Sequence, residues 1–202
     1  MFSLSHSSWI RGRLNFITLS YFRQILVQAT HGSENHTFDM NDLLIAIYIA
    51  IPTYVANSTP VLLGGGAPID RGRKFIDGRR ILGTNKTVRG FSYGLLLGSI
   101  AALAEAILFR NYLLVPVGIV ASTGALLGDL FGAFLKRRLD ILPGNPLPVV
   151  DQLDFILGAL LLASPVLSVT AGAVLILVIA TIPIHLLSNA VAYVLRLKKR
   201  LW

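Results

Sequence analysis

The sequence predicts an all-α membrane protein in which about five helices cross the bilayer. Of its 202 residues, 54% are hydrophobic and only 14% are charged, whereas a soluble domain carries about 25% charged residues. The apolar residues also fall in long runs, which indicates burial in a bilayer rather than in a large water-soluble core. The chain has no cysteine, which excludes disulfides, zinc–thiolate sites and thiol catalysis.

Five apolar stretches of near-spanning length give the expected helices in order. A spanning helix needs about 20 residues, and the fourth stretch is short for this purpose and contains Pro165. The spans are expected at about residues 43–63, 91–109, 113–135, 153–169 and 171–195.

Basic residues gather in alternate connections between these stretches. The loops 64–90 and 136–152 and the C-terminal tail are rich in lysine and arginine, whereas the other two connections contain only Arg110. By the positive-inside rule, both loops and the C-terminus are expected in the cytoplasm and the N-terminus outside. The net charge of +8 would suggest nucleic acid for a soluble protein, but membrane topology accounts for it here. No nucleic-acid partner is expected.

Residues 1–39 do not follow this pattern. Between Trp9 and Val27, three arginines are mixed with apolar residues, which is typical of an amphipathic helix on a membrane surface. The segment is too polar for a further span and lacks a signal-peptide pattern. We therefore divide the chain into an extension, 1–39, which is amphipathic or not native, and a transmembrane domain, 40–202. Met40 is one candidate for the natural start.

Two aspartates, Asp151 and Asp154, stand at the cytoplasmic entry of the fourth stretch. Residues three apart share one face of a helix, and carboxylates at a helix N-terminus are favoured by the helix dipole. Two such carboxylates suit Mg²⁺, which binds oxygen ligands together with substrate phosphates. The alternative is a solvated first turn whose acidic residues only stabilise the helix.

Asp129 is a carboxylate within the third stretch, where burial in the bilayer costs about 3 kcal/mol and demands a partner or a function. Lys136 lies seven residues on, and therefore on the same helical face. The alternative is a structural ion pair. Three glycines at four-residue spacing near this face would allow a helix or a ligand to approach closely: Gly124, Gly128 and Gly132.

The loop 77–90 interleaves glycines, hydroxyl groups and basic side chains directly before a helix. Arginine forks, a lysine point charge and helix N-terminal amides all suit phosphates. The basic charge alone is equally explained by topology and by attraction to anionic lipids. The arrangement Gly83-x-x-Lys86-Thr87-x-Arg89-Gly90 favours phosphate binding, although its glycine spacing is not that of a Walker A loop.

Several of these motifs together resemble one enzyme family, the phosphatidate cytidylyltransferases. The resemblance rests on Lys136-Arg137, the Pro143-Gly144 loop, Asp151-x-x-Asp154 and the upstream Lys86-Thr87-x-Arg89-Gly90. The sequence departs from the family pattern: Gln152 and Arg89 replace an arginine and a glutamate, and a Lys-Asp pair and the histidine of the loop are absent. These departures resemble the archaeal branch, the CDP-archaeol synthases, as do Ala56-Asn57-x-x-Pro60, Pro68-Ile69-Asp70 and the segment from Asp77 to Gly83.

The resemblance extends from about residue 40 to the end and implies both a reaction and its site. The reaction transfers CMP from CTP to an isoprenoid-ether lipid phosphate, unsaturated archaetidic acid, in archaeal phospholipid biosynthesis. The products are CDP-archaeol and pyrophosphate, Mg²⁺ is the cofactor, and the site faces the cytoplasm at the cell membrane. A homodimer is compatible with the family's fold. The implied metal ligands are Asp129, Asp151 and Asp154, which are catalytic together with Lys136. The implied contacts to the phosphates of CTP and lipid are Lys86, Thr87, Arg89, Arg137, Asn57 and, as secondary candidates, Arg79 and Arg80.

Two other functions compete with this interpretation. A CDP-alcohol phosphotransferase would share Asp77-Gly78 with its family motif, but Ile81-Leu82 stands where Ala-Arg is required, and the later aspartates are missing. A non-enzymatic transporter or lipid-binding protein would explain the basic loops and Asp129. It gives no reason for the acidic pair that follows the Pro143-Gly144 loop.

Overall fold

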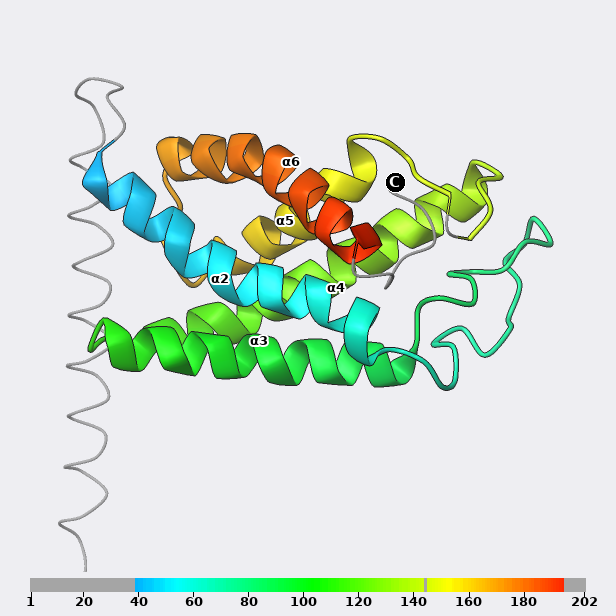
Figure 1. Ribbon diagram of the computed structural model, residues 1–202, viewed down its shortest axis with the longest axis horizontal. Helices are drawn as coiled ribbons and strands as arrows, with labels where there is room; N and C mark the ends of the chain where they lie inside the picture. Colours follow the sequence, from blue (N-terminus) through cyan, green and yellow to red (C-terminus); the bar gives the residue numbers. More distant parts are fainter. Residues whose placement is uncertain (1–38, 144, 195–202) are drawn as a thin grey trace, which may run out of the picture. The chain divides into compact units, whose positions relative to one another are not determined.

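The computed structural model describes residues 39–143 and 145–194, and predictions that concern 1–38, 144 and 195–202 lie outside these ranges. The described chain contains five α-helices and no β-strand, which confirms the all-α prediction. The helices are α2 (Met40–Leu63), α3 (Val88–Leu108), α4 (Leu114–Arg138), α5 (Val150–Ala163) and α6 (Ala171–Val194) (Figure 1).

Four of these helices are long and apolar enough to cross a membrane: α2, α3, α4 and, over Ala171–Val191, α6. The fifth, α5, has 14 residues and is therefore about 21 Å long, shorter than a hydrocarbon core of about 30 Å. The expected fourth span, 153–169, instead begins as a helix at Val150 and ends at Ala163. Its remainder, which includes Pro165, forms turns and irregular chain, because proline cannot supply a helical N–H.

Two helices extend into segments that were expected to be loops. The Thr87 hydroxyl accepts a hydrogen bond from the Gly90 N–H at 3.1 Å, so α3 begins at Val88 rather than at residue 91. Helix α4 continues through Lys136, Arg137 and Arg138, since cations in the last turn are favoured by the helix dipole. The loops are consequently 64–87 and 139–149.

Glycines bring the helices close together. A Cβ on Gly94 of α3 would lie 2.7 Å from the Ala56 carbonyl oxygen of α2, and a Cβ on Gly124 of α4 would collide with the Gly158 carbonyl oxygen of α5. The predicted close approach at the glycines of α4 is therefore confirmed, and the element that approaches is α5.

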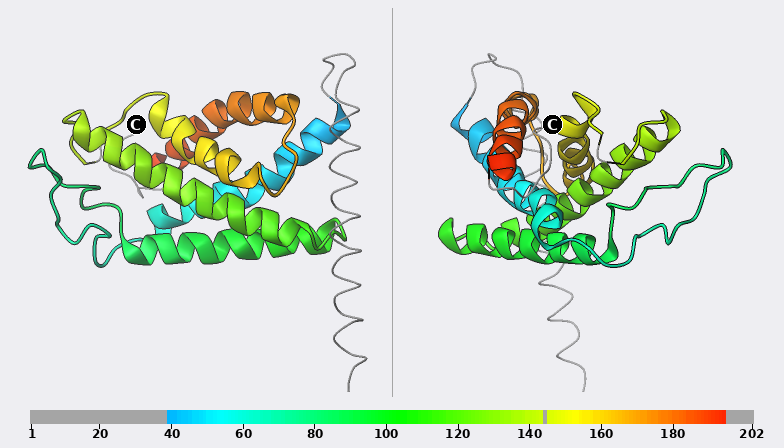
Figure 2. Two further views of the ribbon diagram at one scale, coloured as in Figure 1. Left: turned by 180° about the vertical axis from the view of Figure 1, so that it is seen from behind. Right: turned by 45° about the vertical axis from the view of Figure 1, so that its right-hand side comes forward.

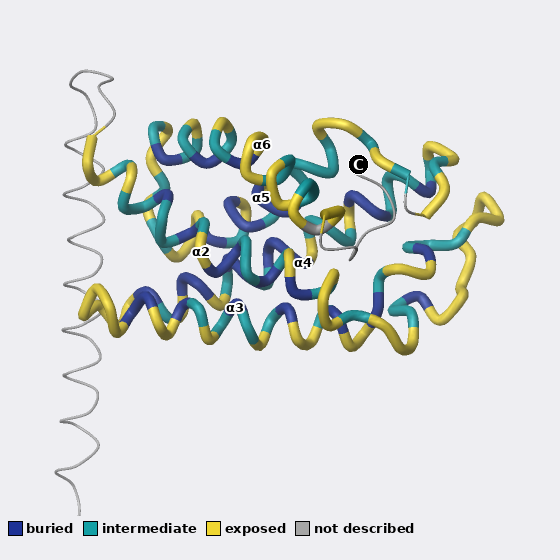
Figure 3. The backbone as a smooth tube through the Cα atoms, viewed as in Figure 1, coloured by how far each residue is buried: buried dark blue, intermediate teal, exposed yellow. Residues whose placement is uncertain are grey.

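Many apolar residues of the helices are exposed, and exposed positions recur along α3 at the edge of the bundle (Figure 3). Examples from three helices are Leu96, Ile107, Leu127, Ile179 and Leu187. Exposed apolar residues around four long apolar helices are what a lipid environment requires. The chain is a multi-pass membrane protein.

Both long loops leave the same end of the bundle. Helices α2 and α4 end there, and α3 and α5 begin there, so both connections leave the bundle at this end (Figures 1 and 2). This end, called the loop end below, collects the basic residues and aspartates that the sequence singled out.

Candidate active site

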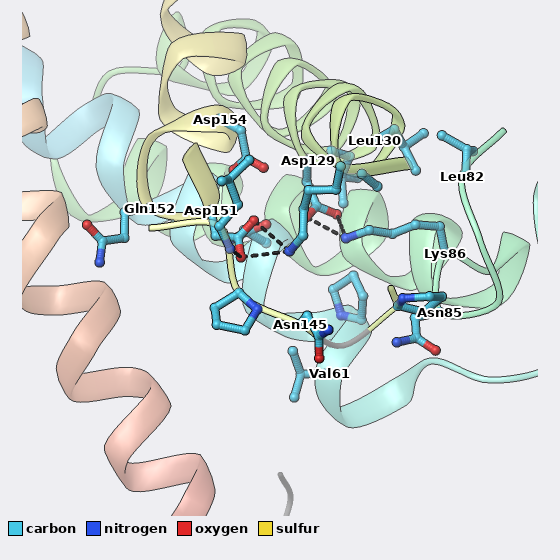
Figure 4. A pocket seen from close by; sticks show the side chains of 18 of the residues that line it. Val61, Leu82, Asn85, Lys86, Asp129, Leu130, Asn145, Asp151, Gln152 and Asp154 are labelled. Carbon is cyan, nitrogen blue, oxygen red and sulfur yellow. Dashed lines mark hydrogen bonds and ion pairs between the residues drawn. The ribbon is translucent and has the colours of Figure 1, made fainter. Parts of the chain in front are cut away.

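A cavity of about 860 Å³ opens at the loop end, between the ends of the helices and the two loops (Figure 4). Its lining combines charged side chains from α4, α5 and the first loop with apolar and amide side chains from α2 and α6. Eight of the predicted site residues line it: Asn57, Lys86, Thr87, Asp129, Lys136, Arg137, Asp151 and Asp154.

Lys86 and Asp129 form the first charged pair of the cavity. The Lys86 ammonium donates to both carboxylate oxygens of Asp129, at 2.5 and 2.6 Å. The first loop places Lys86 because its two ends are tied together: the Ile69 N–H donates to the Lys86 carbonyl oxygen at 2.8 Å, and Thr87 caps α3. The partner of Asp129 is thus a loop lysine and not Lys136 from its own helix.

Lys136 and Asp151 form the second charged pair. The Lys136 ammonium donates to the two carboxylate oxygens of Asp151 at 2.8 and 2.7 Å. The same carboxylate accepts the Leu147 N–H at 2.9 Å, and the Asp151 N–H donates to the Leu147 carbonyl oxygen at 3.0 Å. Asp151 therefore ties the second loop to the start of α5 while its charge faces the cavity.

Asp154 completes the group of three carboxylates. Its side chain lies against Gly132 of α4, where a Cβ would collide with its Oδ2 atom. The charges of Asp129, Lys86 and Asp151 all act on it. The absence of a side chain at residue 132 leaves the space in which this carboxylate sits beside the other two.

We expect Gly132→Ala to reduce activity far more than stability. The added methyl group meets a carboxylate side chain, which can rotate away, rather than backbone, so the loss in melting temperature should be small. The displaced Asp154 should lower turnover at least about tenfold, because small misplacements of catalytic groups are costly. Detergent-solubilised protein would be assayed for the reaction that the sequence resemblance implies and for thermal unfolding. Full activity in Gly132→Ala would show that the position of Asp154 is unimportant.

Arg137 is a buried cation on the wall of the cavity. Its residue is 7% exposed, and its Nε and Nη1 groups have no hydrogen-bond partner within residues 39–143 and 145–194. An unpaired buried guanidinium is costly unless an anion completes it. Its fork geometry suits a phosphate group.

The structure does not bring Arg79, Arg80 and Arg89 to the cavity wall. Arg79 donates to the Arg138 carbonyl oxygen at 2.9 Å and pairs with Asp140 at 3.3 Å. Arg89 is exposed and lies 5.6 Å from the centre of the Tyr93 ring. Arg80 pairs with Asp70 at 2.5 Å. In this structure Arg79 and Arg80 therefore pair with loop residues, and Arg89 lies on the exposed side of α3.

Asp70 organises the first loop. Its carboxylate also accepts the N–H groups of Gly72, Leu82 and Gly83 at 2.9 to 3.0 Å. Burial alone would raise the pKa of Asp70, but the hydrogen bonds from Arg80 and from these N–H groups outweigh it and hold the pKa well below its usual value. The loop therefore folds around an ionised carboxylate at neutral pH.

Several polar residues of the lining are not among the site residues that the sequence predicts. Asn85, Asn145 and Gln152 line the cavity, as do His185 and Asn189 from α6. The available signal for the last two was their position after Pro183 in an apolar helix, which equally fits ordinary hydrogen bonds between helices. The spacing of residues in the sequence does not indicate that α6 lies beside the two loops.

The donor set fits Mg²⁺ bound together with substrate. Three carboxylates supply the hard oxygen ligands that Mg²⁺ prefers, and Gly132 leaves space for one of them. Within the described part of the chain, no group of three or more carboxylate or imidazole side chains is already placed to hold a metal ion. Mg²⁺ usually needs only one or two carboxylates plus phosphates, so a complete protein cage is not required.

The chain is similar to one described family and to proteins from several organisms. A family model described as CarS-like, CDP-archaeol synthase, matches residues 40–202. A CDP-archaeol synthase of Pyrococcus abyssi is 43% identical, with 81% of this chain and 100% of the relative covered. One of Methanococcus aeolicus is 43% identical, with 79% and 97% covered.

A solved structure shares this fold. It is described as an intramembrane enzyme for archaeal membrane lipids biosynthesis and is 41% identical in sequence, with a TM-score of 0.69. The similarity covers 72% of this chain and 93% of that one.

Proposed function

This chain belongs to the CDP-archaeol synthase family, and we propose that the cavity at the loop end is where CMP passes from CTP to a lipid phosphate. The chain is an enzyme that forms CDP-archaeol in a CTP-dependent reaction of archaeal lipid biosynthesis. The observation that carries the proposed site is the opposition of three carboxylates and three cations around one cavity.

The chemistry needs charge neutralisation more than a base. An oxygen of the lipid phosphate monoester attacks the α-phosphorus of CTP, a new P–O bond forms, and the bond to the β-phosphate oxygen breaks to release pyrophosphate. A phosphate monoester has a second pKa of about 6, so it is already largely ionised at pH 7. The site must therefore hold two anions in line and stabilise the developing charge.

The cationic side chains of the cavity suit the phosphates of both substrates. Arg137 has donors with no partner among the residues that the structure describes, and Lys86 and Lys136 present ammonium groups at the cavity wall. Asp129, Asp151 and Asp154 are the residues that would hold Mg²⁺, which supplies neutralisation of phosphate charge. Asn57 and Thr87 line the same wall, although the Thr87 hydroxyl is engaged in capping α3.

The location of the cavity suits a soluble nucleotide that must meet a membrane lipid. The loop end carries most of the basic residues that flank the spans, which favours placing it in the cytoplasm of the cell, at the cell membrane. CTP then reaches the site from water while the lipid keeps its chains in the bilayer. A homodimer, which is compatible with the family, stays a prediction.

The orientation can be tested with single cysteines because the chain has none. Ile76 is 94% exposed in the first loop, and Tyr112 is 71% exposed between α3 and α4, at the other end of the bundle. In intact cells, a membrane-impermeant maleimide should label Tyr112→Cys, and it should label Ile76→Cys only after permeabilisation. The cysteine-free protein gives the background. The reverse pattern would place the cavity outside the cell.

The proposed reaction is separated from its rivals by its substrates and products. Purified protein would be incubated with labelled CTP, Mg²⁺ and unsaturated archaetidic acid. The proposal predicts release of pyrophosphate and a CDP-lipid product. A CDP-alcohol phosphotransferase would instead consume a CDP-lipid and release CMP, and a transporter would form no product. Absence of a CDP-lipid from folded protein would refute the proposed function.

A further inference from the structure

The lipid substrate must reach the cavity without leaving the bilayer. Each CH₂ group moved from hydrocarbon into water costs about 0.8 kcal/mol, so two long isoprenoid chains cannot pass through the aqueous opening between the loops. The phosphate head must therefore enter from the side, between two helices. The line along which two neighbouring helices meet is called a seam below, and one seam has to admit the head.

Three seams between neighbouring helices are closed by close contacts. Glycines bring backbone or short side chains together between α2 and α3, between α3 and α4, and between α4 and α5. The side chains of α5 and α6 meet through rings whose centroids are 6.2 Å apart, and the residues that line the cavity beside this ring pair, Gln152 of α5 and His185 of α6, are polar and offer no edge for hydrocarbon chains. The contacts concerned are Gly94 with Ala56, Gly98 with Ser122, Gly124 with Gly158, and Phe155 with His185.

The seam between α2 and α6 differs along its length. The two helices run in the same direction, joined at their first turns by a hydrogen bond from Thr170 to Asp42 and further on by one of 2.7 Å between Tyr54 and Thr181. Beyond Tyr54, towards the loop end, residues of both helices line the cavity. The seam is therefore closed near the middle of the two helices and borders the cavity beyond it.

The border of this seam is apolar. Val61 of α2 lines the cavity and is also 47% exposed on the surface of the bundle. Leu186 of α6 lines the cavity as well. The next residues, Leu62 and Leu187, are exposed and point away from the lining. An apolar edge that touches both the bilayer and the cavity suits hydrocarbon chains, and Asn57 lies one helical turn from Val61 on the cavity wall.

We propose that the lipid phosphate enters the cavity sideways between α2 and α6, past Val61 and Leu186, and that its chains stay in this seam during the reaction. The proposal rests on the proposed function, because it assumes that a lipid phosphate is the acceptor. It places the head group near Asn57 and the cationic wall, and it makes Val61 and Leu186 residues that determine how the lipid is accepted.

A pair of tryptophan substitutions on adjacent residues tests this path. Leu186→Trp narrows the seam, whereas Leu187→Trp adds the same bulk on the lipid-exposed side. Leu186→Trp should raise KM for long-chain lipid phosphate at least about tenfold while KM for CTP is unchanged, since only binding of the lipid is altered. Leu187→Trp should behave as wild type. A short-chain, water-soluble glycerol phosphate ether, measured as a substrate or as a competitive inhibitor, should bind both variants equally.

Several other outcomes would contradict entry of the lipid between α2 and α6. Equal effects of the two tryptophans, equal losses with short and long chains, or an increase in KM for CTP would each contradict it. If Leu186→Trp does not fold, Val61→Cys with Leu186→Cys can be bridged by a flexible thiol reagent that a reductant removes. The bridge should abolish long-chain turnover and spare CTP binding, and reduction should restore turnover; undiminished turnover while bridged would refute the path. Failure of unmodified protein to form any CDP-lipid would instead reject the proposed function.

Discussion

Asp151→Asn is expected to lower CMP transfer at least about a hundredfold, the size of effect seen when one group that stabilises transition-state charge is removed. The substitution removes a carboxylate that faces the cavity and is assigned to Mg²⁺. It also removes the negative charge that pairs with the Lys136 ammonium. The measurement is the rate of pyrophosphate release by detergent-solubilised protein at saturating CTP and lipid phosphate.

Asp140→Asn is the matched control for this experiment. It makes the same change of charge at a nearby residue whose side chain is 75% exposed and pairs with Arg79, outside the lining of the cavity. It should retain nearly full activity. In Asp151→Asn, any residual activity should require a higher Mg²⁺ concentration. Full transfer by Asp151→Asn would eliminate the metal assignment.

Gly124→Ala is expected to have the largest effect on stability. The new methyl group would meet the backbone of α5, at the Gly158 carbonyl oxygen and the Ala159 Cα, and backbone cannot rotate away as a side chain can. Overpacking of this kind costs about 1–3 kcal/mol. The free energy of unfolding should fall accordingly, which would appear as a lower melting temperature in detergent.

Two comparisons make the Gly124 result specific. Leu127→Ala changes an exposed residue of the same helix and should leave the melting temperature nearly unchanged. Gly132→Ala adds the same methyl group against the movable Asp154 side chain and should lose activity before stability. If Gly124→Ala melts at the wild-type temperature, the close packing of α4 on α5 is not what stabilises this part of the bundle.

The helices were predictable because the signals for them are local. Long apolar runs and alternating basic connections mark membrane spans in any sequence, and they located α2, α3, α4 and α6 to within a few residues. The length of α5 was harder to foresee. Its apolar run continues past Ala163, and only Pro165 indicated that the helix could not use all of it.

The residues around the cavity were predictable only in part. Asp129, Asp151, Asp154, Lys86 and Lys136 belong to short motifs that resemble a family, so their gathering at one end could be expected. Their pairing could not, because it depends on how the first loop folds back onto α4. Lys86 takes the partner that helical spacing had suggested for Lys136.

The contacts of the arginines in the first loop were likewise not predictable from the sequence. Charge and spacing made Arg79 and Arg80 candidates for phosphate binding. In the structure, Arg79 contacts Arg138 and Asp140, which are far away in the sequence, and Arg80 pairs with Asp70 within the same loop. Arg137, by contrast, has donors at the cavity that find no partner in the described part of the chain, a property that only the packing of its neighbours reveals.

The fate of position-labelled CTP tests the central claim most directly. Purified protein would be incubated with Mg²⁺, unsaturated archaetidic acid and CTP labelled with ³²P on either the α- or the γ-phosphate. The account predicts that the α-label appears in the lipid product and the γ-label in pyrophosphate, and that Asp151→Asn forms both labelled products at least about a hundredfold more slowly. Appearance of the γ-label in the lipid, or no label in the lipid with folded wild-type protein, would contradict it.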